Sequence, residues 1–391
     1  MGAEQHQRTV PENDVTDLRA ELPYSGGFAF CMLEKGMKRM KKESLKRWGL
    51  AALPGAVSVL LLYIAAHLPG FADLYRTFVF RPLSRAVSAF SGLFPFSLSE
   101  LLLAVLLFFG IAGLIRCLLG KLAPAEVLRH LFFAASVLLF LFTVFCGINY
   151  RAKPFSSQAD LPVRESSPEE LRDLCRQIAE EVNRRAEVLE DAEVPSLSAQ
   201  ALSGQQAMEA LGEEFPDLSG PFPRPKFLML SRLLSIQQVT GIYSPFTVEA
   251  NCNREIPGYN MPFTICHELS HLRGFMREDE ANFIGFLAAS RAEDPYFSYS
   301  GWLSGWVYAG NTLAETDRQA FEEIHGMLCE RALKDLAENN RFWEQFEGAA
   351  AETHEKINDA YLRANGQQEG VKSYGRMVDL MLAWARVHPF S

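Results

Sequence analysis

Three long apolar stretches in the first 150 residues constrain the fold more than any other feature of the chain. They run roughly over residues 50–68, 101–119 and 131–148, and each approaches the ~20 residues that a helix needs to cross a bilayer. The second and third contain "LLLAVLLFFGIAGLI" and "LFFAASVLLFLFTVF", which carry no charge, whereas Pro54 and Gly55 interrupt the start of the first. Charge-free runs of this length are rare in water-soluble folds. We therefore expect three transmembrane helices rather than buried core helices.

Basic residues set the expected orientation of these spans. Seven of them precede the first span, a density typical of a cytoplasmic flank: Lys35, Lys38, Arg39, Lys41, Lys42, Lys46 and Arg47. Three crossings then place everything after about Tyr150 outside the cytoplasm. Three arginines in the first outer loop argue against this orientation, but the clustered charges outweigh them. The first span resembles a signal peptide in its basic flank, but no small-residue cleavage site follows it, and two further spans would still anchor the chain.

The expected domains are a cytoplasmic basic tail over residues 1–48, a three-helix transmembrane region over 49–150, and an extracytoplasmic domain over 151–391. Residues 1–31 lack a periodic apolar pattern, which is typical of a disordered tail or of a start placed too far upstream. From residue 154 on, acidic residues outnumber basic ones by 37 to 21, which excludes nucleic acid as a partner. Anionic lipid would also repel this acidic domain, so we expect the spans to contact the lipid bilayer and the domain to stand off the membrane except where they hold it. The seven cysteines show no paired spacing, which indicates neither a disulfide framework nor a cysteine zinc cluster.

The outer domain is expected to have an α+β, mostly helical fold. The period of apolar residues predicts a helix over 168–189, followed by a loop rich in Ser, Pro and Gly. Between 224 and 253, β-branched and aromatic residues broken by Gly241 and Pro245 predict short strands or a hairpin. Helical patterns return after 258 and continue to the end of the chain.

One short motif carries the chemistry. Residues 267–271, "HELSH", match HExxH, in which His267 and His271 lie one helical turn apart on the same face and can bind one ion. Glu268 lies about 100° round the helix and can act as general base toward a water at that ion. The opposite face is apolar and offers a core contact through Ile265, Leu269 and Leu272.

A third protein ligand is expected from the segment that follows. Gly274 can end the motif helix in a left-handed conformation, and "REDEANF" has the acidic start of a second helix. Projected from Glu278, the face that carries Asn282, Gly285 and Ala289 is small and polar, suited to close packing on the motif helix, with Asn282 orienting a ligand. Glu280 falls among apolar residues instead. We therefore prefer Glu278 as the third ligand and keep Glu280 as the alternative.

These motifs resemble known zinc peptidases. HExxH followed by a helix with E-x-x-A-[DN] is similar to the gluzincins, including the CAAX prenyl protease and beta-lactam sensor groups, and to ImmA/IrrE-type peptidases. More closely, the three spans with "SPFTVEANCN", "PFTICHELSHLRGFMREDEANF" and "GVKSYGRMVDLMLAWAR" resemble a bacterial family of membrane proteins classed as a domain of unknown function, with a zincin-like core. The spacing from His271 to Glu278 is shorter than in typical gluzincins, and Arg277 stands where metzincins have a histidine.

The resemblance implies a zincin-like metallopeptidase domain that binds Zn²⁺. We expect a multi-pass protein of the cell membrane that hydrolyses a peptide or protein substrate near the membrane, with His267, His271 and Glu278 as metal ligands and Glu268 as general base. A zinc-binding sensor without turnover and a structural protein without metal are the alternatives. Weaker candidates for stabilising an oxyanion are Tyr308, His354, Tyr374 and Arg376. Cys266 projects away from the histidine face, and we expect it to pack rather than to bind metal.

Overall fold

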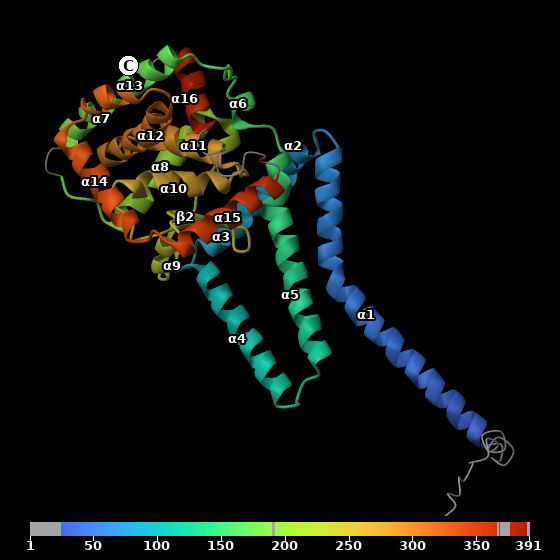
Figure 1. The fold of residues 1–391 in the computed structure, drawn as a ribbon. Coiled ribbons are helices and arrows are strands. Elements are labelled where there is room, and N and C mark those ends of the chain that lie inside the picture. Colours follow the sequence, from blue (N-terminus) through green and yellow to red (C-terminus); the bar gives the residue numbers. More distant parts are fainter. Residues whose placement is uncertain (1–24, 190–191, 366, 368–375, 389–391) are drawn as a thin grey trace, which may run out of the picture. The chain divides into compact units, whose positions relative to one another are not determined.

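The computed structural model describes residues 25–189, 192–365, 367 and 376–388 (Figure 1). The chain divides into two units, residues 1–53 and 54–391, and each is considered by itself. Helix α1 (Ser25–His67) begins in the first unit and ends in the second. Much of the expected tail, residues 1–24, lies outside the described residues. From Ser25 on the backbone is helical, so residues 25–31 of the expected disordered segment belong to α1.

Three helices of the described chain are long and apolar enough to cross a membrane, as predicted. They are residues Glu43–His67 of α1, helix α4 (Leu98–Leu118) and helix α5 (Pro124–Phe145). The last begins at Pro124 rather than at 131, because a proline at the first helical position and Glu126 in the first turn both favour a helix start. Helices α4 and α5 project from the domain as a hairpin (Figure 1).

Short helical elements connect the spans to the domain. Between the first two spans lie α2 (Phe71–Tyr75), a π-helical turn η1 (Arg76–Phe80) and α3 (Arg81–Ser91). After α5 come a 3-10 turn η2 (Gly147–Arg151) and α6 (Phe155–Gln158).

The remaining residues form a mostly helical domain with few strands, which confirms the α+β, mostly helical fold class. Its elements are α7 (Pro168–Leu189), α8 (Leu197–Glu214), a 3-10 turn η3 (Pro216–Leu218), β1 (Lys226–Phe227), α9 (Ser231–Ile236), β2 (Gly241–Ser244), β3 (Glu249–Cys252), α10 (Asn260–His271), α11 (Glu278–Ser290), α12 (Pro295–Thr316), α13 (Arg318–His325), α14 (Glu330–Glu344), α15 (Ala349–Ala364) and α16 (Arg376–Val387).

The predicted strands form one small sheet with the order β1-β3-β2. Strands β2 and β3 make an antiparallel hairpin with Ile242 opposite Asn251, and β1 pairs with β3 in parallel. All four residues of the central strand β3 are buried. The hairpin packs against α10, the helix that carries the HExxH motif.

The loop expected after residue 189 is wrong over most of its length, because α8 occupies it. The hydroxyl of Ser196 accepts a hydrogen bond from the Ala199 amide and caps the helix. Gly204 weakens the helical pattern in the sequence, but a Cβ at this position would collide with Ile265 of α10. Gly204, one of the small residues that suggest a loop, therefore lets α8 and α10 pack closely.

Helix α10 lies inside the domain, between α8, α11, α12 and the sheet. The apolar side predicted from the motif is fully buried: Ile265, Leu269 and Leu272 have no exposed surface. This packing fixes the rotation of α10 and directs the histidine face toward α11.

Candidate metal centre

A tight bend brings the two helices of the site together. Helix α10 ends at His271, and Gly274 has a φ of +90°, the left-handed conformation predicted for it. Helix α11 then begins at Glu278 with three acidic residues in its first turn, where the helix dipole favours negative charge. The first residue of α11 thereby lies beside the histidine face of α10.

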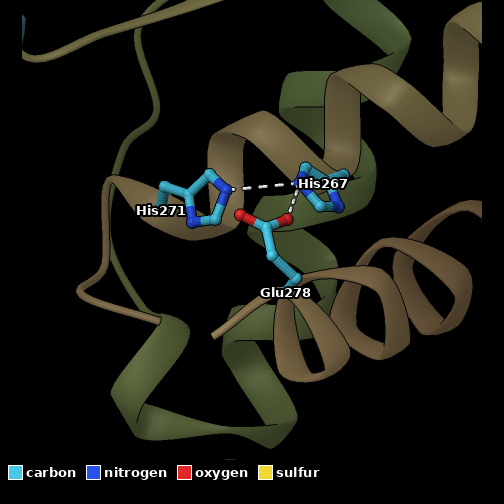
Figure 2. A group of neighbouring side chains, drawn as sticks. All are labelled: His267, His271 and Glu278. Atoms are coloured by element: carbon cyan, nitrogen blue, oxygen red, sulfur yellow. Dashed lines mark hydrogen bonds and ion pairs between the residues drawn. The ribbon is translucent and has the colours of Figure 1, made fainter. Parts of the chain in front are cut away.

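The structure brings His267, His271 and Glu278 into one group. Figure 2 shows the three side chains pointing toward one another, the histidines from α10 and the glutamate from the start of α11. One ligand atom from each lies within 4.8 Å of the others. The Nε2 atoms of the two histidines are 3.2 Å apart, and an oxygen of Glu278 lies 3.3 Å from Nε2 of His267.

The Nδ1 atom of each histidine donates a hydrogen bond that fixes the orientation of its ring. Nδ1 of His271 donates to the backbone oxygen of Phe275 at 2.6 Å, and Nδ1 of His267 donates to the side-chain oxygen of Asn282 at 2.8 Å. A neutral imidazole with its proton on Nδ1 has a lone pair on Nε2. Two such lone pairs, together with a carboxylate oxygen, converge on one point. The group therefore requires a positive charge among these three atoms.

Glu280, the alternative third ligand, is engaged elsewhere. One of its carboxylate oxygens accepts a hydrogen bond from the Phe155 amide at 3.1 Å and forms an ion pair with Arg277 at 3.2 Å. Its buried carboxylate therefore joins α11 to the start of α6, away from the two imidazoles. Of the two glutamates, Glu278 is the one that the fold places at the histidines.

The face of α11 predicted to approach the motif helix does so. Asn282 lies one turn after Glu278 and contacts His267, and Gly285 follows on the same face. A Cβ at Gly285 would lie 3.1 Å from the backbone nitrogen of His267 and 3.3 Å from its Cα and Cβ. Absence of a side chain at this position sets how closely α11, and with it Glu278, approaches α10.

Glu268 lies close to the candidate metal ligands His267, His271 and Glu278, here called the metal group. It is buried, with one oxygen 4.0 Å from Nε2 of His267 and the other without a hydrogen-bond partner among the described residues. A Cβ at Gly241 of β2 would lie 2.6 Å from its nearer oxygen. Sequence reasoning assigned Gly241 only to a break between strands. Its role as the neighbour of Glu268 depends on a contact between segments that no local pattern encodes.

Burial shifts the protonation of the site strongly. Burial raises the pKa of Glu268 to about 8, and burial together with the charge of His267 lowers the pKa of His271 to about 4. For Glu278, burial opposes ionisation, but the hydrogen bond and charge of His267 outweigh it and lower its pKa. For His267, burial opposes the charged form, but Glu278 and Glu268 outweigh it and raise its pKa. Without a metal, a proton on His267 supplies the required charge.

The donor set fits a divalent metal. A proton is shared by at most two of the three atoms, whereas one metal ion can contact both imidazoles and the carboxylate. Two histidine nitrogens and one carboxylate oxygen are a ligand set that zinc uses in catalytic sites, with a further position left for water or substrate. The hydrogen bonds that the oxygens of Asn282 and Phe275 accept fix the tautomers that expose both Nε2 atoms, as the partners of metal-binding histidines usually do.

Of the residues suggested for stabilising an oxyanion, Tyr308 alone is linked to the site among the described residues. The ring of Tyr308 on α12 lies 5.9 Å from that of Phe263, which lies 6.4 Å from the ring of His267. Burial, and to a lesser extent the charge of Glu278, raises the pKa of Tyr308, which places this tyrosine near the site. His354 and Arg376 lie on α15 and α16 and do not belong to the group of three, and Tyr374 lies outside the described residues. Cys266 is fully buried and outside the group, as expected for a packing residue.

Comparison with known proteins gives a family. The model of a family described as "Protein of unknown function (DUF3810)" matches residues 75–382, from α2 to α16, and includes every residue of the metal group. Neither the curated proteins nor the solved structures contain a match. The matched region covers most of the chain, contains two of the three apolar helices described above, and includes the helical domain up to residue 382 within α16. The chain belongs to the DUF3810 family.

Proposed function

We propose that this protein is a membrane-anchored zinc metallopeptidase, with His267, His271 and Glu278 as metal ligands and Glu268 as general base. One observation carries the proposal: two imidazole Nε2 atoms and one carboxylate oxygen converge from adjacent helices beside a buried glutamate. Each imidazole is oriented by a hydrogen bond at its other nitrogen.

The residues of the chain have separate tasks in peptide hydrolysis. A bound Zn²⁺ supplies Lewis acidity, which polarises the peptide carbonyl and lowers the pKa of water. Glu268 removes a proton from the attacking water and delivers it to the nitrogen of the departing amine. Burial raises the pKa of Glu268 to about 8 in the metal-free chain, and the positive charge of a bound metal ion would favour the ionised form that a general base needs. Asn282 and the Phe275 carbonyl hold the histidine rings in place throughout.

In this proposal the helical domain lies outside the cytoplasm and acts on a peptide or protein near the membrane. The basic residues before the first span support a cytoplasmic N-terminus, and three spans then support an outward domain. The end of α10 is bonded through Leu272 to Ser84 of α3, which lies between the first two spans.

The test combines zinc analysis with an assay of peptide hydrolysis on the full chain in detergent micelles. We expect about one zinc per chain. The Glu268→Gln variant should keep the zinc and lose hydrolysis of a quenched fluorescent peptide library. The matched control is Glu187→Gln, at an exposed position on α7, which should keep both.

Three results would contradict the proposal. Absence of zinc from the wild-type protein removes the metal centre. Equal hydrolysis by wild type and Glu268→Gln removes the general base. A zinc-bound wild type that hydrolyses none of the peptides favours the alternative that follows.

The alternative is a zinc-binding membrane sensor or binding module without turnover, and one observation favours it. The buried Glu249 of β3 accepts hydrogen bonds from the amides of Leu98 and Ser99 in the first turn of α4, at 3.1 and 3.0 Å. Strand β3 packs on α10. A transmembrane helix is therefore joined to the metal-bearing helix through a single strand, a route by which ligand capture can be reported across the membrane.

A further inference from the structure

The segment between the first two spans buries polar residues and exposes large apolar ones, the reverse of a helix at a water-facing surface. Its inward side carries buried polar residues, namely Arg76, Ser84, Ser88 and Ser91. Its outward side carries large apolar side chains at high exposure: Leu74 62%, Phe78 72%, Phe90 59%, Leu93 77% and Phe96 45%. A helix at a water-facing surface buries its apolar side and exposes its polar side. The outward side of residues 71–96, here called the apolar face, therefore requires an apolar neighbour.

Contacts on the inward side fix the direction of the apolar face. The hydroxyl of Ser84 donates to the backbone oxygen of Leu272 at 2.9 Å. The guanidinium of Arg76 donates to the backbone oxygen of Lys153 at 3.2 Å and lies over the ring of Phe275 at 5.0 Å. Both side chains donate hydrogen bonds to the domain, so the segment cannot turn its apolar face inward without breaking these bonds.

The position of the segment in the chain identifies the neighbour. The first span ends at His67 and the second begins at Leu98, so both ends of the segment lie at the same surface of the bilayer. Among its exposed residues Arg85 is the one with a charge, and its guanidinium donates to the backbone oxygen of Ser219 at 2.7 Å. The apolar face thus lies where lipid is closest and presents almost no charge to it.

A second group of exposed apolar side chains lies at the start of α9, next to the first turn of α4. Met229 is 72% exposed, and Leu230 and Leu233 are 46% and 49% exposed around the start of α9. The amides of Met229 and Leu230 donate to the carboxylate of Glu100, in the first turn of α4, at 3.1 and 2.7 Å. Figure 1 shows α3 and α9 at the end of the domain from which α4 projects.

We propose that residues 71–96, together with the start of α9, form a lipid-contacting surface that seats the domain on the bilayer. Lipid is the one neighbour that the spans already bring to both apolar groups. The surface also lies directly under the metal group, because Ser84 contacts the residue after His271. One consequence rests on the peptidase function proposed above: substrates would meet the metal centre at about one helix diameter, ~10 Å, from the membrane surface.

Photo-crosslinking in phosphatidylcholine nanodiscs tests the proposal on the full chain. The photoreactive amino acid p-benzoylphenylalanine replaces Phe78, Phe90 or Leu93 in separate variants, because an aromatic replacement at an exposed position preserves the packing inside. The matched control carries it at Val188, a residue 64% exposed on α7. Intact mass then reports addition of a lipid, and a denaturing gel reports crosslinked protein.

We expect a lipid adduct at positions 78, 90 and 93 and none at 188. Crosslinks from the three positions to a second copy of the chain, without lipid adduct, would overturn the proposal in favour of a dimer interface. Equal lipid labelling at 188 or absence of labelling at all three positions would also overturn it. Zinc is not needed for any of these readouts, so the result is independent of the proposed peptidase activity.

Discussion

Gly285 offers the sharpest test of how the metal group is assembled. The Gly285→Ala substitution adds one methyl group between α11 and α10. That methyl group would lie 3.1 Å from the backbone nitrogen of His267 and 3.3 Å from its Cα and Cβ. All three contacts are with the backbone or Cβ, which cannot move aside as the end of a flexible side chain can. The two helices must therefore separate by a few tenths of an ångström.

Two opposing terms set the size of the effect on stability. Alanine in place of glycine favours a helix by about 1 kcal/mol. Overpacking of a well-packed core costs about 1–3 kcal/mol. The expected net loss is about 1 kcal/mol in the free energy of unfolding, equivalent to about 2 °C in melting temperature for a chain of this size. Separation also moves Glu278 and Asn282 away from His267, for which we expect about a tenfold loss of zinc affinity.

The assay measures zinc affinity by competition with a fluorescent chelator and melting temperature by intrinsic fluorescence, on full-length protein in detergent. The matched control is Gly110→Ala in α4, where the added methyl group has no atom within 4 Å. We expect the control to match wild type in zinc affinity. Unchanged zinc affinity together with a raised melting temperature in Gly285→Ala would show that helix propensity dominates. The close contact at His267 would then play no part in positioning the metal group.

Three further substitutions separate the roles of buried polar groups. Asn282→Ala should weaken zinc binding about 10- to 100-fold, measured with the same chelator, because His267 loses the acceptor that fixes its tautomer. Glu280→Ala should leave zinc binding unchanged and cost about 1–3 kcal/mol in denaturant unfolding, because the Phe155 amide loses its partner; loss of zinc would instead make Glu280 a ligand. Glu249→Ala should lower the free energy of unfolding by about 3 kcal/mol without changing zinc content, because the first turn of α4 loses two charge-assisted hydrogen bonds; equal stability would refute this.

The sequence predicts those parts of the fold that depend on local periodicity. The apolar runs locate the spans to within a few residues at most ends, and the acidic start after Gly274 predicts α11. The projection from Glu278 predicts which face of α11 meets α10, because a period of 3.6 residues fixes Asn282 and Gly285 on that face. Helix α8 is not predicted because Gly204 weakens its helical pattern, and the residue that Gly204 packs against, Ile265 of α10, lies far away in sequence.

The parts of the site that were not predicted are contacts across the fold. The acceptor for His271 is a backbone oxygen, that of Phe275, and a backbone atom leaves no trace in residue identity. The neighbour of Glu268 is a glycine on another element, Gly241, whose role is to leave space. Preference for Glu278 over Glu280 follows from helix geometry alone, but the partner that occupies Glu280, the Phe155 amide, becomes visible only once α6 is placed.

The bend at Gly274 explains how Glu278 reaches the two histidines although only six residues separate it from His271. A left-handed residue with φ +90° reverses the chain within a few residues, so α11 starts at the level of the second histidine and needs no intervening element. The same residue is restricted from outside, because a Cβ there would lie 3.0 Å from Arg76 and from Phe80 of the segment that we assign to the bilayer surface. One glycine thus satisfies two requirements, the reversal that brings Glu278 to the histidines and the close contact with the lipid-facing segment. If both proposals hold, the metal centre and the membrane-seating surface share a structural element, because the bend that positions Glu278 packs against Arg76 and Phe80.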